Sequence, residues 1–193
     1  MNITVIIIFL VSIILLLIYY LLYYLLSPSC PHIPTLVNCT NNNYPVLGGT
    51  DLVNLYNFND HALTGDSKYK LIYLGYTYLF SNNYNKQLFK HDPDKYIPQN
   101  GGFCSWAIAT EYKPSFVWGK KCLGPAVSLN SKFIYNDKLY LFLADKPYEK
   151  FKKNIEENIK KADDRYLKWY SKPGQIMNTT CVFDDYNKLI IKV

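Results

Sequence analysis

The chain of 193 residues is long enough for one modest domain with additional segments, and it carries a formal net charge of +6. Half of that excess lies between Asp145 and Lys172, where nine Lys and Arg residues are interspersed with six Asp and Glu residues. A nucleic-acid-binding surface would be a more concentrated basic patch, so we expect no nucleic-acid partner. No motif in the chain predicts a cofactor.

Residues 1–26 contain no Asp, Glu, Lys, Arg or His, and residues 3–26 are mostly apolar with tyrosines at positions 19, 20, 23 and 24. A helix of about 20 apolar residues spans the hydrocarbon core of a bilayer, and amphipathic rings prefer the headgroup level. We therefore predict that residues 3–26 form an uncleaved transmembrane helix in contact with the lipid bilayer. The alternative is a cleaved signal peptide and a secreted protein. Against it, the apolar run exceeds the usual 7–15 residues or so and no basic residue precedes it.

Cysteines and glycosylation sequons indicate the side of the membrane on which the remainder lies. The chain has five cysteines, and it has sequons at Asn38 (NCT) and Asn178 (NTT). Cysteines behind a hydrophobic N-terminus favour an oxidising compartment, and N-glycans are added to secreted domains. We expect a disulfide-linked glycoprotein whose C-terminal domain is luminal or extracellular.

Residues 27–50 are rich in proline and asparagine, lack charge and end near Gly48 and Gly49. Such composition is typical of a loop, and it predicts a juxtamembrane stalk over residues 27–50 followed by an ectodomain over residues 51–193.

The ectodomain begins with an alternating pattern over residues 68–81, which predicts a β-hairpin with its turn at Leu74 and Gly75. Gly75 suits the left-handed position of a bulged loop. Ser81 is positioned to cap a helix over residues 82–90, and Asp92-Pro93 ends that helix because a residue before proline leaves the helical region. Residues 99–102 then form a turn, after which Cys104 opens another helix.

Later segments complete the prediction. A second hairpin over residues 132–143 turns at Asn136 and Asp137, which both tolerate positive φ. From Pro147, apolar residues recur at helical spacing as far as Trp169, as one helix or as two helices broken near Asn158. We therefore predict an α+β fold in which two β-hairpins form a small antiparallel sheet with packed helices, in addition to the N-terminal transmembrane helix.

The segment YTYLFSNNYNKQLFKHDPDKYIPQNGGFCSWAIA, residues 76–109, resembles the YHS-domain family. The resemblance continues in CLGPA, YNDKLYLF, ADDRYLKWY and MNTTC, and it covers residues 54–181. It implies an α+β fold and is strongest with the secreted branch, whose biochemical role is poorly defined. Some YHS and related TRASH domains are thought to bind metals through cysteines after the Phe. This chain has Phe80-Ser81-Asn82 there, so those thiolates are missing.

Metal binding is therefore the alternative function, not the leading one. A structural zinc site pairs its ligands at short spacing, whereas the cysteines here are far apart and His32, His61 and His91 are scattered. His91 lies where the C-terminal end of a helix favours an imidazolium. We predict no metal site and no catalytic residue.

The cysteines are better explained as disulfides. A Cys104–Cys122 bridge would close a loop and stabilise the fold by about 3 kcal/mol in the entropy model. Cys39 and Cys181 bracket the domain and are the second expected pair, although four cysteines allow three connectivities. Cys30 then remains for an intermolecular bond. A thiol enzyme using Cys104, with His91 as base, is the less favoured reading because no orienting carboxylate is evident.

Aromatic residues leave a ligand-binding role open. Trp106, Trp118 and Tyr140 are candidates to line a cleft, although aromatic side chains are more often core. A protein or polysaccharide partner is compatible with such a surface. The sequence as a whole predicts a single-pass, membrane-anchored YHS-like binding or structural module, without an assigned ligand.

Overall fold

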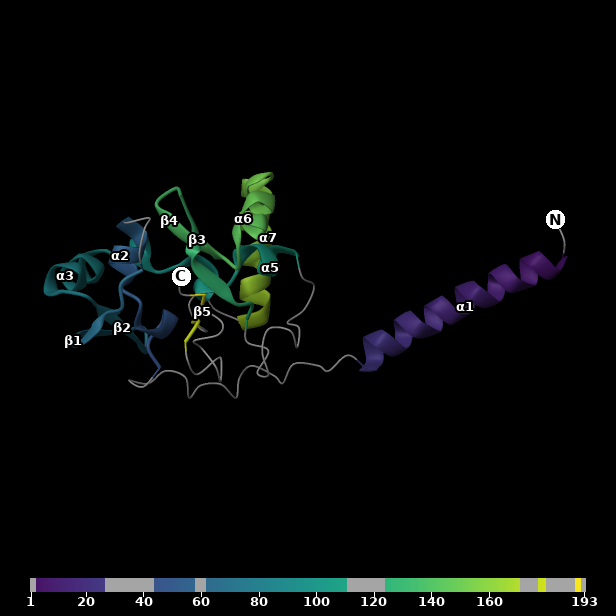
Figure 1. The fold of residues 1–193 in the computed structure, drawn as a ribbon, viewed down its shortest axis with the longest axis horizontal. Helices are drawn as coiled ribbons and strands as arrows, with labels where there is room; N and C mark the ends of the chain where they lie inside the picture. Colours follow the sequence, from purple (N-terminus) through teal and green to yellow (C-terminus); the bar gives the residue numbers. More distant parts are fainter. Residues whose placement is uncertain are drawn as a thin grey trace.

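The computed structural model describes residues 3–26, 44–57, 62–110, 124–170, 177–179 and 190–191. The elements follow one another in a mixed order (Figure 1): α1 Ile3–Leu26, η2 Leu47–Gly49, α2 Leu52–Asn57, β1 Asp66–Tyr73, β2 Tyr76–Phe80, α3 Asn83–His91, α4 Pro93–Tyr96, η3 Gln99–Gly102, α5 Ser105–Thr110, β3 Val127–Tyr135, β4 Lys138–Phe142, α6 Asp145–Lys152, α7 Ile155–Tyr170 and β5 Ile190–Ile191.

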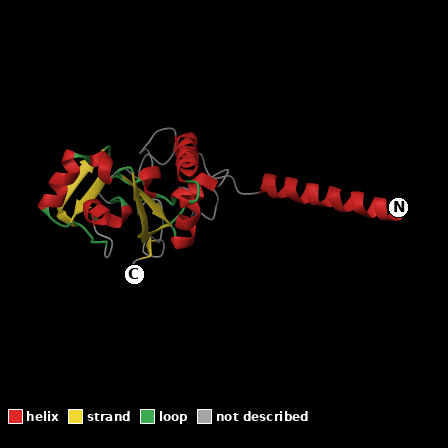
Figure 2. Cartoon of the chain, turned by 90° about the horizontal axis from the view of Figure 1, so that it is seen from above, coloured by secondary structure: helices red, strands yellow, loops and turns green. Residues whose placement is uncertain are grey.

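The predicted α+β class is confirmed, but the prediction of one antiparallel sheet is wrong. Strands β1 and β2 form a two-stranded sheet, whereas β4, β3 and β5 form a separate sheet in which β5 runs parallel to β3. Helices α2 and α3 lie beside the first sheet. Helices α5, α6 and α7 lie on the side of the second sheet that faces away from the first, as Figures 1 and 2 show. The short helices and turns from α4 to α5 connect these two halves.

Both hairpin turns lie where the sequence predicts them. In the first, Tyr73 pairs with Tyr76 across a two-residue turn in which Leu74 and Gly75 have φ values of 48° and 82°. This tight turn replaces the bulged loop suggested by the sequence, and two positive φ values match the right-handed twist of the strands. In the second, Asn136 and Asp137 have φ values of 49° and 57°.

The core is rich in phenylalanine. Phe89 of α3 packs against Tyr78 and Phe80 of β2 at ring-centroid distances of 4.8 and 5.1 Å. On the other side of the domain, Phe142 of β4 meets Phe151 of α6 at 5.1 Å. Full burial of each such side chain contributes roughly 1.5–3 kcal/mol, so these rings dominate the packing within each half.

Helix α3 is capped by Asn82 and not, as predicted, by Ser81. The Asn82 Oδ1 accepts a hydrogen bond from Asn85 N at 2.8 Å, and the helix begins at Asn83. Ser81 is recruited elsewhere, because its N–H and its Oγ both donate to Asp51 Oδ2, at 2.7 and 2.6 Å. A tertiary contact thus moves the cap by one residue.

Asp51 is completely buried and fully hydrogen-bonded. Its Oδ1 accepts from the backbone N–H groups of Val53 and Asn54, both at 3.0 Å, which caps the start of α2. Its Oδ2 accepts from Ser81 and also from Asn85 Nδ2 at 2.7 Å. A buried carboxylate requires such partners, so this network joins α2 to the hairpin and to α3.

The helical stripe after Pro147 is two helices, as one alternative predicted, but the break lies earlier than Asn158. It falls at Lys153 and Asn154, between α6 and α7. Asn158 is instead buried within α7, where its Nδ2 donates to Phe151 O at 2.9 Å. This bond satisfies a carbonyl at the end of α6 that has no intrahelical partner.

The stalk predicted over residues 27–50 extends too far. Val46 and Leu47 are each 1% exposed. Val46 N donates to Thr77 O at 2.9 Å, and Leu47 N donates to Asn178 O at 2.7 Å. Residues 46–50 therefore belong to the folded domain, while residues 27–43 lie outside the described residues.

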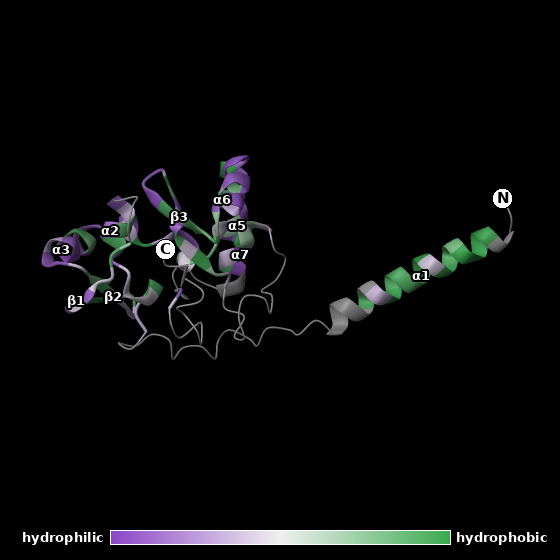
Figure 3. Ribbon diagram, in the orientation of Figure 1, coloured by the Kyte–Doolittle hydropathy of each residue, from purple (hydrophilic) through white to green (hydrophobic). Residues whose placement is uncertain are grey.

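Helix α1 lies away from the rest of the fold and is mostly apolar (Figures 1 and 3). Its described apolar side chains, at positions 5–19 and 21, are between 37% and 67% exposed, so α1 is not a core helix. Within the part of the chain that the structure describes, no helix combines the length and apolar character needed to cross a membrane. The bilayer contact predicted for residues 3–26 stays a prediction.

Candidate functional site

The turn formed by η3 is the structural base of the candidate site. Asn100, Gly101 and Gly102 have φ values of 52°, 65° and 77°, a left-handed run that suits glycine and asparagine. A Cβ on Gly102 would lie 3.1 Å from Pro98 Cγ, so space also restricts this position. The turn predicted at residues 99–102 is confirmed, and it contacts β4, α5 and α7.

A short C-terminal segment holds this turn in place. Asn178 N donates to Gly101 O at 2.8 Å, and Asn178 Nδ2 donates to Gly102 O at 2.9 Å. Asn178 is only 1% exposed, so these bonds are shielded from water. The segment at residues 177–179 therefore positions one wall of the cavity described next.

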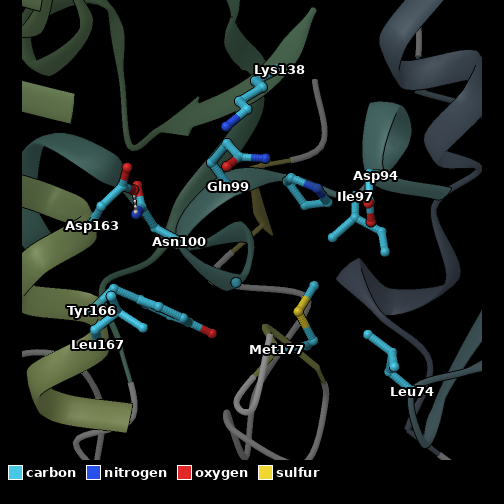
Figure 4. A pocket seen from close by; sticks show the side chains of 12 residues that line it. Leu74, Asp94, Ile97, Gln99, Asn100, Lys138, Asp163, Tyr166, Leu167 and Met177 are labelled. Carbon is cyan, nitrogen blue, oxygen red and sulfur yellow. Dashed lines mark hydrogen bonds between the residues drawn. The ribbon is translucent and has the colours of Figure 1, made fainter. Parts of the chain in front are cut away.

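A pocket of about 460 Å³ opens beside η3, between the two halves of the domain. Figure 4 shows side chains from the β1–β2 turn, the α4–η3 segment, β4, α7 and the C-terminal segment around it. Its polar lining residues are Asp94, Gln99, Asn100, Lys138 and Asp163. Its apolar lining residues are Leu74, Ile97, Pro98, Tyr166, Leu167 and Met177.

Asp163 on α7 is the half-buried carboxyl of this pocket. Asn100 Nδ2 donates a hydrogen bond to Asp163 Oδ1 at 3.1 Å, which is the contact drawn in Figure 4. Burial raises the pKa of Asp163 above its ordinary value of 3.8, while the Asn100 bond and the charge of Lys138 oppose the shift. The Asn100 hydrogen bond thus holds the carboxyl in place. Together with the charge of Lys138, it offsets only part of the cost of burying the ionised form.

Lys138 supplies the opposite charge. It is the first residue of β4, directly after the Asn136–Asp137 turn, and its positive charge acts to lower the pKa of Asp163. Among the described residues, however, Lys138 forms no ion pair with a carboxylate. An ammonium and a carboxyl that face one pocket without joining leave hydrogen-bonding capacity for a ligand.

Buried side chains form part of the apolar wall. Tyr166 and Met177 are 4% and 1% exposed, and Figure 4 shows the Tyr166 ring extending toward Met177. Ile97 and Pro98 also belong to the apolar lining. Apolar walls with a few fixed polar groups are typical of small-molecule sites.

The predicted disulfides are not tested by the described residues. Cys104 is 2% exposed, and its segment pairs with Leu141 of β4 in an isolated parallel bridge. Cys30, Cys39, Cys122 and Cys181 lie outside the described residues. The Cys104–Cys122 and Cys39–Cys181 pairings stay predictions.

The less favoured thiol-enzyme reading receives no support from the geometry. Cys104 is buried directly before α5, whereas His91 is exposed at the last position of α3, as its sequence context predicted. In a thiol enzyme, the general base must lie within hydrogen-bond reach of the nucleophilic cysteine. The pocket is lined by neither residue.

The glycan expected at Asn178 does not fit the folded domain. Its side-chain nitrogen, to which a glycan would be attached, is buried and already donates to Gly102 O. A glycan there would expel this side chain from the interior. The other sequon, Asn38, lies outside the described residues, and its glycosylation stays a prediction.

Metal binding is also untested over much of the chain. Within the described ranges, no three His, Cys, Asp or Glu side chains gather as a metal ion would require. His32 and His61 lie outside those ranges.

The aromatic cleft suggested by the sequence is not the pocket. Tyr140 is 2% exposed and packs against Phe151, and Trp106 lies under Lys150 with the ammonium 5.9 Å from its ring centroid. Trp118 lies outside the described residues. The pocket uses Tyr166 instead.

Sequence reasoning missed the polar residues of the site. In the sequence, Asp163 falls in the stretch of interspersed basic and acidic residues between Asp145 and Lys172, Asn100 falls in the predicted turn, and Lys138 follows a hairpin turn and carries no signal of its own. One clue was available, since an asparagine before two glycines marks a tight loop that presents its side chain in a fixed direction.

Comparisons of the chain with protein-family models, curated proteins and solved structures found no match. The resemblance to the YHS-domain family therefore stays an expectation that rests on the residues quoted for it.

Proposed function

We propose that this protein is a single-pass, membrane-anchored binding module of YHS-like type, and that its ligand occupies the pocket beside η3. The observation that carries the proposal is the pocket itself, where the half-buried Asp163 carboxyl and the Lys138 ammonium share one cavity without forming an ion pair. The ectodomain is proposed to be luminal or extracellular on the basis of the cysteines.

The pocket supports binding because two of its polar groups, Asn100 and Asp163, are already oriented. Asn100 is fixed by the left-handed η3 turn, and it in turn holds the Asp163 carboxyl at 3.1 Å. A ligand that binds there does not have to order these side chains, which lowers the cost of association.

Although no described helix meets the length and apolar character of a membrane span, the exposed apolar side chains of α1 support membrane anchoring. A helix that exposes so much apolar surface is unfavourable in water by roughly 25 cal/mol for each Å². Insertion into lipid removes that cost, and the tyrosines at positions 19, 20, 23 and 24 suit the interface.

The pocket is tested by ligand-observed NMR of the full chain in nanodiscs, with a mixed library of small fragments. We expect fragments whose saturation transfer disappears in Asp163→Asn and persists in Asp164→Asn. Asp164 is the matched control, because it is the next carboxyl on α7, is exposed and does not line the pocket. Fragment binding that is indifferent to both substitutions would refute the proposed site.

The anchor is tested by alkaline extraction of membranes that contain the full chain. We expect the native protein to remain in the pellet. The double substitution Ile14→Arg and Leu15→Arg should release it, since each central arginine costs about 2.5–3.5 kcal/mol on insertion scales. The conservative pair Ile14→Leu and Leu15→Ile is the control. Recovery of the native, uncleaved chain in the supernatant would contradict the anchor.

A further inference from the structure

The Asp163 carboxylate has one oxygen in use and one available. Oδ1 accepts the hydrogen bond from Asn100. Oδ2 accepts no hydrogen bond from the described residues. A half-buried carboxylate oxygen in a pocket is a strong acceptor, so the ligand should present a hydrogen-bond donor here.

Lys138 restricts the charge of that ligand. An ammonium group placed at Asp163 would be repelled by Lys138, and a carboxylate placed at Lys138 would be repelled by Asp163. A neutral hydroxyl satisfies both groups, because it donates to the carboxylate and accepts from an ammonium. Gln99 adds an amide that both donates and accepts.

The rest of the pocket requires an apolar face on the same ligand. Tyr166 and Met177 are buried side chains that present carbon and sulfur surface to the pocket, and Ile97 adds apolar surface to its lining. Asp94 and Lys138 are both solvent-exposed, but of the two it is Lys138 whose charge acts on the Asp163 carboxyl, so Lys138 and not Asp94 sets the charge requirement there. A small molecule with several hydroxyl groups along its edges and C–H groups on its face matches this distribution.

We propose, on the basis of the binding function inferred above, that the pocket binds a neutral saccharide, with ring hydroxyls bridging Asp163 and Lys138 and a C–H face against Tyr166. An uncharged sugar meets each requirement at once: donor, acceptor, apolar face and no net charge. A cavity of about 460 Å³ lies within the usual range for small-ligand sites.

The probes for the test are sugars of matched shape and different charge. Methyl glycosides of glucose, galactose, mannose and N-acetylglucosamine are the neutral set, glucosamine carries an ammonium, and glucuronic acid carries a carboxylate. Affinities are measured by titration NMR on the full chain in nanodiscs at neutral pH. We expect at least one neutral sugar to bind about tenfold more tightly than both charged sugars.

Two substitutions should switch the preference in opposite directions. Asp163→Asn should lower the affinity for the neutral sugar by about tenfold. It should raise the affinity for glucuronic acid relative to that of the neutral sugar, because the repelling carboxylate is gone. Lys138→Met should raise the affinity for glucosamine relative to that of the neutral sugar, because the repelling ammonium is gone. Asp164→Asn should change none of these affinities. A residue with only a structural role would lower all affinities together and would not change their order.

Several results would overturn the proposal. One is a charged sugar that binds the native chain more tightly than every neutral sugar. Another is a fragment that binds in an Asp163-dependent manner while no sugar binds, which would leave the binding function standing and remove the saccharide. If neither fragments nor sugars bind, the proposed function itself fails. Circular dichroism establishes that each variant is folded, and if Asp163→Asn unfolds, the Lys138→Met result decides alone.

Discussion

Two aspartates, one in each half of the domain, are held in opposite ways. Asp51 is fully buried beside the first hairpin and accepts five hydrogen bonds, from Val53, Asn54, Ser81 and Asn85. Asp163 on α7 is half-buried and accepts one, from Asn100. A carboxylate surrounded by donors has no hydrogen-bonding capacity left for a ligand, and it stabilises the fold. A carboxylate that has a single donor and lies beside a cavity retains that capacity.

The largest expected effect is on the Asp51 network. Asp51→Ala leaves buried N–H groups at the start of α2 and at Ser81 without acceptors, so the free energy of unfolding should fall by about 3 kcal/mol or more. Urea unfolding of the full chain in detergent, followed by tryptophan fluorescence, measures it. Asp66→Ala is the control, since exposed Asp66 accepts one bond, from Lys68 N, and should cost less than about 1 kcal/mol. If both variants lost the same free energy of unfolding, the buried Asp51 network would contribute no more to stability than the exposed Asp66 bond.

A smaller effect is expected at the cap of α3, which lies next to the same network. Asn82→Ala removes the bond to Asn85 N and should lower the free energy of unfolding by about 1 kcal/mol. Asn83→Ala, the exposed first residue of the helix, is the matched control and should be nearly neutral. A loss at Asn83 as large as that at Asn82 would show that the cap is assigned to the wrong residue.

The smallest effect on stability is expected at Asp163, with a dependence on pH that distinguishes it. Because burial raises its pKa above 3.8, the folded state binds the proton more tightly than the unfolded chain, so ionisation disfavours folding. Relative to the native chain, Asp163→Asn should therefore gain stability as the pH rises from below 3.8 through the raised pKa. Since the carboxyl is only half-buried, solvent screening should keep the gain below about 1 kcal/mol.

This gain is measured as the difference in thermal midpoint between Asp163→Asn and the native chain over a pH series. Asp164→Asn serves as the reference for the loss of one carboxyl from α7. A difference that decreases with rising pH would mean that the folded state stabilises the ionised Asp163 carboxylate, which would contradict the direction expected from its burial.

Local chemistry explains which elements were predictable from the sequence. The turns at Leu74-Gly75 and Asn136-Asp137 depend on residues that adopt positive φ, and they lie where expected. The stop at Asp92-Pro93 is equally local, and the helix ends there. Each of these features is decided by a residue and its immediate neighbours.

The corrections come from contacts between residues far apart in the chain. Ser81 loses the cap position because Asp51, thirty residues earlier, takes its hydroxyl. The two hairpins do not join into one sheet, because in the second hairpin β3 pairs with β5 and β4 is bridged at Leu141 by Cys104, which follows the η3 turn. Asn178 is buried by the turn it holds, which no triplet in the sequence reveals.

By itself, the sequence determined the apolar N-terminal helix, the two hairpins and the helix-rich α+β character, because periodicity and turn residues act over short distances. Only the tertiary structure decided where the pocket lies. Asn100, Lys138 and Asp163 come from a turn, a strand and a helix, and packing alone brings them to one cavity. The capacity of Asp163 for a ligand depends on how few donors reach it, and that number is set by the fold.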